Sequence, residues 1–149
     1  MKQPNERPKI QPPLLALIFI ALAFVLGLLL PLPFPVAPLL RTAGFVLAII
    51  GFLLGLAALM AFRAARKNSG GPRLITSGVY RFSRNPVALG FVFMLAGLPL
   101  NAGSYWGLGL TPAMMVAFNW FVIEPEERSL ARRFGKEFEN YKSLVRRWL

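Results

Sequence analysis

The sequence lacks two residue types that carry much of enzyme chemistry, because its 149 residues include no cysteine and no histidine. Without cysteine the chain has no disulfide, thiol nucleophile or thiolate metal ligand. Without histidine it lacks the commonest metal ligand and the commonest general base. We therefore expect no metal site and no histidine-dependent or cysteine-dependent catalysis.

Acidic residues are scarce as well, with 6 Asp plus Glu against 17 Lys plus Arg and a net charge of +11. Such an excess is compatible with nucleic-acid binding, but the basic residues flank apolar segments. Membrane topology and attraction to anionic headgroups explain that placement first. With 56% hydrophobic residues and a mean hydropathy of +0.55, the composition indicates a membrane protein whose partners are lipids and not nucleic acid.

Hydropathy predicts an all-α, polytopic membrane protein with four transmembrane helices and a C-terminal amphipathic interfacial helix. Residues 14–30 carry no charge and are long enough to cross a hydrocarbon core of about 30 Å. A signal peptide is the alternative for this segment, which is longer than a typical apolar region of that kind and lacks a clear cleavage pattern after it. The predicted spans are 14–30, 42–62, 86–100 and 105–123, followed by an interfacial helix over 126–148.

The chain divides into a proline-rich cytoplasmic tail, residues 1–13, and a single membrane domain, residues 14–149. Gly44, Gly51 and Gly55 lie on roughly one face of the second span, which predicts close packing against a neighbouring helix. Between residues 63 and 85 there are six basic residues and no acidic one. By the positive-inside rule this loop and both termini are cytoplasmic, as expected for a protein of a bacterial inner membrane.

Polar side chains concentrate in the segment TSGVYRFSRNPVALG, residues 76–90, between long apolar segments. Asn85 is a good N-cap and Pro86 suits the first turn of a helix, so a helix is predicted to start there. The positive end of that helix would face a cationic loop and favour an anionic or electron-rich group. The alternative is a basic loop that only orients the membrane spans. The candidate residues of this loop are Tyr80, Arg81, Arg84, Asn85 and Pro86.

A second polar cluster, Glu124-Pro125-Glu126-Glu127, ends the apolar hairpin that Pro86 begins. Both ends of a hairpin return to one membrane face, so this cluster is predicted to meet the loop around Arg84. The alternative for Glu126 and Glu127 is a pair of charges that favours the dipole of the helix after Pro125.

The last segment carries an apolar stripe at helical spacing among many basic residues, which predicts one interfacial helix. The stripe consists of Leu130, Phe134, Phe138, Tyr141, Val145 and Trp148.

The stretches LITSGVYRFSRNPVALG and IEPEERSLARRFGKEFENYKSLVRRW together resemble the integral membrane methyltransferases grouped with isoprenylcysteine carboxyl methyltransferase and the phospholipid methyltransferases. The resemblance covers roughly residues 73–149, and the first two spans match only in hydropathy. The family loop commonly reads Arg-His-Pro-x-Tyr-x-Gly, whereas this chain has Asn85 in place of histidine and Ala88 in place of tyrosine.

The resemblance implies S-adenosylmethionine as the cofactor and a lipophilic methyl acceptor. The cofactor-binding residues that it implies are Tyr80, Arg81, Arg84, Asn85, Pro86, Gly90, Glu126, Glu127 and Tyr141; it implies no particular catalytic residue. Methyl transfer from a sulfonium needs no metal and little acid or base when the acceptor is nucleophilic, so the lack of histidine is no obstacle.

Two other functions stay open on the sequence. Sterol and steroid reductases resemble the same family in their C-terminal halves and bind NADPH, but they are usually much longer. A non-catalytic membrane protein that binds anionic lipid or a partner through its basic face is the third possibility. Asn119, the rare polar residue of the hairpin, is read as a helix contact or as a lining of the acceptor's passage.

Overall fold

The computed structural model describes residues 10–67 and 73–149, and these residues form helices joined by short connections. Most of the predicted tail lies outside the described residues, as do residues 68–72 of the predicted cytoplasmic loop. The elements of the described chain are α1 (Pro12–Leu29), α2 (Pro38–Lys67), a 3-10 turn η1 (Gly78–Arg81), α3 (Pro86–Ala102), α4 (Tyr105–Phe118), a π-helical turn η2 (Asn119–Ile123), α5 (Glu124–Phe134) and α6 (Lys136–Leu144).

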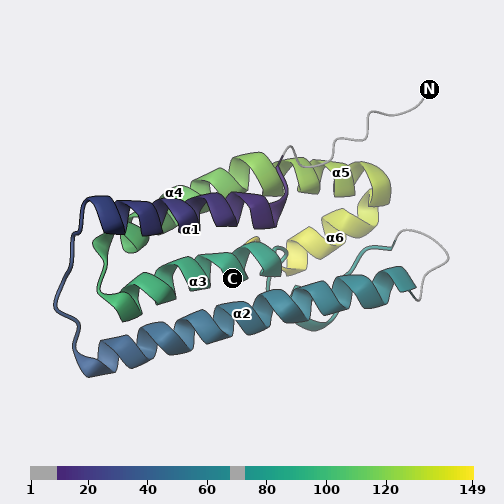
Figure 1. Cartoon of the computed structure of the whole chain (residues 1–149). Coiled ribbons are helices and arrows are strands. Elements are labelled where there is room, and N and C mark those ends of the chain that lie inside the picture. Colours follow the sequence, from purple (N-terminus) through teal and green to yellow (C-terminus); the bar gives the residue numbers. More distant parts are fainter. Residues whose placement is uncertain (1–9, 68–72) are drawn as a thin grey trace.

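Four long helices run side by side, with α3 between α2 on one side and α1 and α4 on the other (Figure 1). One end of this bundle carries the two short connections between helices, residues 30–37 and 103–104, and is called the turn end below. The opposite end carries residues 73–85, α5 and α6 and is called the loop end. Most of the charged residues of the described chain therefore gather at one end of an apolar bundle.

Glycines bring α2 and α3 into backbone contact. A Cβ atom at Gly51 would lie 2.5 Å from the Gly90 carbonyl oxygen, and one at Gly97 would lie 2.5 Å from the Gly44 carbonyl oxygen. Only glycine permits such an approach of two helices. The predicted packing role of Gly44 and Gly51 is confirmed, and their partners are on α3. A Cβ at Gly55 would meet no atom within 4 Å, so the packing does not require a glycine there.

The core of the bundle joins α1, α3, α4 and η2. Its largest fully buried side chains include Leu95, Met114, Phe118 and Ile123, and Ala88 is buried among them. By contrast, α1 and α2 leave large aliphatic and aromatic side chains exposed along most of their length. Such an extended apolar exterior is expected of helices that face lipid.

The two connections at the turn end are bonded to each other. Phe34 and Gly103 share a main-chain hydrogen bond of 2.9 Å, and Tyr105 donates one of 3.1 Å to Leu32. The Trp106 indole N–H donates to the Leu30 carbonyl oxygen at 2.6 Å. These bonds satisfy polar backbone groups where the helices end. They fix the α1–α2 connection against the α3–α4 connection.

Three helices of the described chain are long and apolar enough to cross a membrane, judged by length and composition: Pro12–Leu29, Pro38–Ala65 and Tyr105–Phe134. The fourth predicted span corresponds to the shorter apolar helix α3. The all-helical fold and the multi-pass character are thus confirmed, whereas four separate spans are not.

The boundaries differ from the prediction in two helices. The second helix runs from Pro38 to Lys67, beyond the predicted 42–62, because arginine, lysine and alanine are good helix formers and the helix continues past the apolar segment. The fourth segment does not stop at Ile123. It passes through the π-helical turn into α5, with Ile123 and Glu124 in helical conformation.

The predicted single helix over 126–148 is wrong. Gly135 has φ 50° and separates α5 from α6, and the helix ends at Leu144. A positive φ suits glycine and breaks the helical path. The turn directs the apolar stripe of α6 at the protein, where Phe138 and Tyr141 are 1% and 7% exposed.

Candidate functional site

The loop before α3 is held by the last few residues of the chain. The Arg84 main-chain N–H donates to the Arg146 carbonyl oxygen at 3.0 Å. The Arg147 carbonyl oxygen accepts from the Ser83 hydroxyl at 3.2 Å and from the Asn85 side-chain amide at 3.4 Å. Residues 145–149, called the closing segment below, therefore fix the backbone that leads into α3.

Asn85 occupies the N-cap position of α3, as predicted, and Pro86 begins the helix. The predicted side-chain cap is wrong, because the Asn85 amide binds the closing segment and no side-chain cap bond is formed. The Asn85 main-chain N–H instead donates to the Ser83 hydroxyl at 3.1 Å. Ser83 is 1% exposed and serves both as a donor to Arg147 and as an acceptor from Asn85.

Two arginines converge on one carboxylate at the loop end. Arg84 Nη1 lies 2.9 Å from Glu127 Oε1, and both side chains are about one-tenth exposed, at 10% and 11%. Arg147 donates from Nη2 to Glu127 Oε2 at 2.7 Å and from Nε to Oε1 at 3.3 Å. The prediction that the two polar clusters meet is confirmed, and the three side chains together carry a net positive charge.

Arg84 retains unused donor capacity. Its Nε is buried and has no hydrogen-bond acceptor among the described residues, whereas Nη1 lies in the ion pair with Glu127. Leaving a buried charged donor without an acceptor costs on the order of 1–3 kcal/mol. An anionic acceptor at this place would offset that cost.

Tyr80 and Tyr141 form a second contact beside this cluster. The Tyr141 hydroxyl donates to the Tyr80 carbonyl oxygen at 2.7 Å. Burial raises the pKa of the Tyr80 phenol to about 12, and the charge of Glu126 adds to the rise. Burial also raises the pKa of Tyr141 to about 12, although the nearby Arg84 opposes it. Both phenols stay protonated at neutral pH, and Glu126 lies close enough to Tyr80 to act on it.

The remaining predicted residues have different surroundings. Arg81 is exposed on η1. Gly90 is buried against α2, where a Cβ would lie 2.6 Å from the Gly51 carbonyl oxygen, so packing requires this glycine. Glu126 is exposed, whereas Glu127 is 9% exposed and paired. Thus the structure brings together Tyr80, Arg84, Asn85, Glu126, Glu127 and Tyr141 at the loop end, with Arg81 at its margin and Gly90 in the helix interface.

The alternative reading of Glu126 and Glu127 as charges at a helix start is weakened by the backbone. They lie in the first turn of α5, but α5 continues directly from η2. A helix that continues from another has its first N–H groups bonded already and offers little free positive end.

Arg147 and Ser83 are the site residues that the sequence interpretation missed. Arg147 lies among many basic residues of the last segment, and no local pattern separates it from Arg146. The only available signal was its place in the run RRW, beside a tryptophan that packs against the core.

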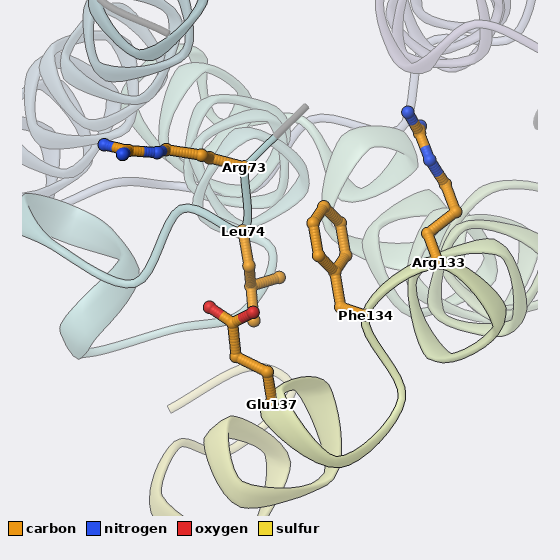
Figure 2. A pocket seen from close by; sticks show the side chains of 5 residues that line it. All are labelled: Arg73, Leu74, Arg133, Phe134 and Glu137. Atoms are coloured by element: carbon orange, nitrogen blue, oxygen red, sulfur yellow. The ribbon is translucent and has the colours of Figure 1, made fainter. Parts of the chain in front are cut away.

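A cavity of about 670 Å³ is lined by residues outside this cluster: Arg73, Leu74, Arg133, Phe134 and Glu137 (Figure 2). The Arg73 side chain points away from the Phe134 ring. None of the residues of the Arg84–Glu127 cluster lines the cavity. We place the candidate site at the cluster, because there the Arg84 Nε is buried and lacks an acceptor among the described residues.

Among the described residues no group of three or more His, Cys, Asp or Glu side chains could hold a metal ion. The fold and the cluster define a multi-pass membrane protein with a charged site at one end of an apolar helical bundle.

Residues 39–137 match the family model described as phospholipid methyltransferase, and the chain belongs to that family. The match includes nearly all of α2, which resembled the family only in hydropathy on our reading of the sequence, and it ends before Tyr141 and the closing segment. Family membership implies methyltransferase activity in general. No curated protein and no solved structure matches the chain.

Proposed function

We propose that the protein transfers a methyl group from S-adenosylmethionine to a lipophilic acceptor at the cytoplasmic face of the membrane. Membership of the phospholipid methyltransferase family supports the reaction class. The exposed apolar side chains of α1 and α2 support a position within lipid. The location that we propose is a bacterial inner membrane with both termini in the cytoplasm, so that the loop end meets the cytoplasmic cofactor pool.

The unpaired Nε donor of Arg84 carries this proposal. A buried guanidinium whose Nε has no acceptor among the described residues is suited to the carboxylate of S-adenosylmethionine, since charge-assisted hydrogen bonds are among the strongest in proteins. The net positive charge of the cluster favours the same group. This donor is covered by protein in the present conformation, so we expect neighbouring side chains to shift when the cofactor binds.

Glu126 offers the complementary handle. The residue is exposed next to the paired Glu127, and its charge acts on Tyr80. Burial of the carboxyl group within the cluster and the charge of Glu127 raise the pKa of Glu126, and a bound ammonium group would oppose that rise. A carboxylate in that place can accept hydrogen bonds from an ammonium group or from ribose hydroxyls. The residues present therefore fit both charged ends of the amino-acid portion of S-adenosylmethionine.

The cofactor supplies a methyl group on a sulfonium: an electron pair of the acceptor forms the new bond to carbon, and the carbon–sulfur bond breaks to leave a neutral thioether. The chain's task is to align the two reactants and to keep water away. Arg84 and Glu126 would fix the cofactor's position, and the apolar surfaces of α3 and α4 would hold the acceptor. Alignment and desolvation can supply most of the acceleration of such a displacement.

The acceptor that we propose is amphipathic and enters sideways from the bilayer. Residues 87–100 and 108–123 are almost entirely apolar, with Asn119 the main exception. The Asn119 Oδ1 atom is buried and has no hydrogen-bond partner among the described residues, so it could accept a bond from the acceptor's headgroup only after neighbouring side chains move. A water-soluble acceptor would find few partners along these helices.

The test is equilibrium titration of the purified protein with S-adenosylmethionine and, separately, with NADPH. We expect saturable binding of S-adenosylmethionine alone. Arg84→Ala and Glu126→Ala should each weaken it by about 1.5–3 kcal/mol, the value of a charged hydrogen bond. Arg128→Ala is the matched control, because Arg128 is exposed and adjacent to Glu127.

Binding of NADPH alone would replace the proposal with a reductase of related fold. Binding of neither ligand would favour a non-catalytic protein that binds anionic lipid or a partner.

A further inference from the structure

The Glu127 carboxylate is oriented mainly by Arg147. The Arg147 guanidinium donates to both oxygens of the carboxylate, Nη2 to Oε2 at 2.7 Å and Nε to Oε1 at 3.3 Å. Two parallel bonds from a planar guanidinium fix both the place and the plane of a carboxylate. Arg84 contributes one ion pair to the same group, at 2.9 Å.

The main chain next to this guanidinium holds the other half of the site. The Arg147 carbonyl oxygen accepts from Ser83 and Asn85, and the Arg146 carbonyl oxygen accepts from the Arg84 main-chain N–H. One short segment therefore contacts both Glu127 on α5 and the loop that carries Arg84. The loop precedes the α3–α4 hairpin in the chain and Glu127 follows it.

We infer that Arg147 is a positioning residue of the methyltransferase site: it holds Glu127 toward Arg84 and leaves the Arg84 Nε free for the cofactor. The expected effect of Arg147 on cofactor affinity rests on the proposed function. Its role in orienting Glu127 is independent of that function. It goes beyond the family match, which ends at residue 137.

Charge balance explains why a second cation is needed. With Arg147 absent, Arg84 would still lie within salt-bridge distance of Glu127. Glu127 could then turn so that Arg84 donates to both of its oxygens. The Arg84 Nε would then no longer be available to the cofactor. Lysine would restore the charge but not the two-point contact, because its ammonium is a single donor centre.

Two measurements test the inference on the full-length protein, with Arg147→Ala, Arg147→Lys and the control Arg128→Ala. Without ligand, hydrogen–deuterium exchange of the peptide covering residues 80–90 should rise in Arg147→Ala and stay at the wild-type rate in Arg128→Ala. Affinity for S-adenosylmethionine should fall about tenfold to a hundredfold in Arg147→Ala, as for loss of a charged hydrogen bond. Arg147→Lys should recover little of it.

Added guanidinium ion at millimolar concentration should restore part of the affinity of Arg147→Ala and leave Arg128→Ala unchanged, an effect that general destabilisation would not give. Combined with Glu127→Gln, the Arg147→Ala change should cost less than it does alone.

Equal exchange and equal affinity in Arg147→Ala and Arg128→Ala would overturn the inference. If wild-type protein binds no S-adenosylmethionine while exchange still rises in Arg147→Ala, the proposed function fails and the positioning role stands. If Arg147→Ala does not fold, Arg147→Lys decides: wild-type affinity and exchange in that variant would contradict the two-point role.

Discussion

The Tyr141 hydroxyl donates a hydrogen bond of 2.7 Å to the main-chain carbonyl oxygen of Tyr80, so a side chain of α6 closes over the loop that precedes α3. Tyr141 is 7% exposed, and its neighbour Phe138 is 1% exposed. The aromatic face of α6 is thus bound to the protein at the loop end, beside the Arg84–Glu127 cluster.

Tyr141→Phe should lower stability modestly, because it removes this bond and keeps the ring. The expected loss is about 0.5–1.5 kcal/mol, seen as a lower unfolding temperature in detergent. Tyr105→Phe, at an exposed tyrosine of the turn end, is the control. An unfolding temperature equal to that of the control would show that the bond contributes nothing.

Alkaline pH should destabilise the fold through Tyr80 and Tyr141. The pKa of each is raised to about 12, from an ordinary value near 10, so the folded state favours the protonated phenols. Their contribution is fully present below pH 10 and is lost as the pH rises toward 12. Unfolding temperatures measured from pH 8 to pH 12 should fall above pH 10, and less steeply in Tyr80→Phe. Parallel curves for wild type and variant would contradict this.

Gly90→Ala should disrupt the packing of α2 on α3. The new Cβ would lie 2.6 Å from the Gly51 carbonyl oxygen, a backbone atom that cannot move aside. The expected cost is about 1–3 kcal/mol, as for other overpacked sites. Gly55→Ala is the matched control, since no atom lies within 4 Å of its Cβ position. A similar stability of the two variants would argue against close contact of these helices.

Topology reporters fused at Gly70 and at Asn101 should report opposite sides of the membrane. The reason is that α3 connects the loop end to the turn end, and the basic residues gather at the loop end. A fusion at residue 149 should report the same side as Gly70. If Gly70 and Asn101 report one side, α3 does not cross, and the orientation that we propose is wrong.

Methylation should depend on the lipid tail of the acceptor. In membranes or detergent, a long-chain acceptor should react faster than its short-chain analogue with the same headgroup, because residues 87–100 and 108–123 offer almost only apolar surface. Equal rates at equal concentration would exclude sideways entry from the bilayer.

Local signals in the sequence were sufficient for part of this structure. Asn85-Pro86 marks the start of α3 correctly because the restriction on backbone conformation acts within neighbouring residues. The small residues of the second span predict helix contact because no other use of them is common in apolar helices. The meeting of Arg84 with Glu127 follows from the return of a hairpin to its starting side.

Other features depend on contacts that no local pattern records. The apolar stripe continues in phase across Gly135, so periodicity alone could not reveal the break between α5 and α6. Likewise, the Asn85 amide leaves its expected capping position because a carbonyl of the closing segment competes for it. Arg147 is distinguished from Arg146 only by which of them faces Glu127.

Because Arg146 and Arg147 contact the loop before α3, the site is assembled only after the helical bundle has been synthesised. Every apolar helix of the described chain is translated before these residues are. The bundle can therefore insert and pack while the site still lacks one wall, since chains fold from the N-terminal side as they emerge. A ribosome that stops before residue 146 leaves an inserted protein whose site lacks these contacts. Activity then reports translation through residue 147, which insertion alone does not.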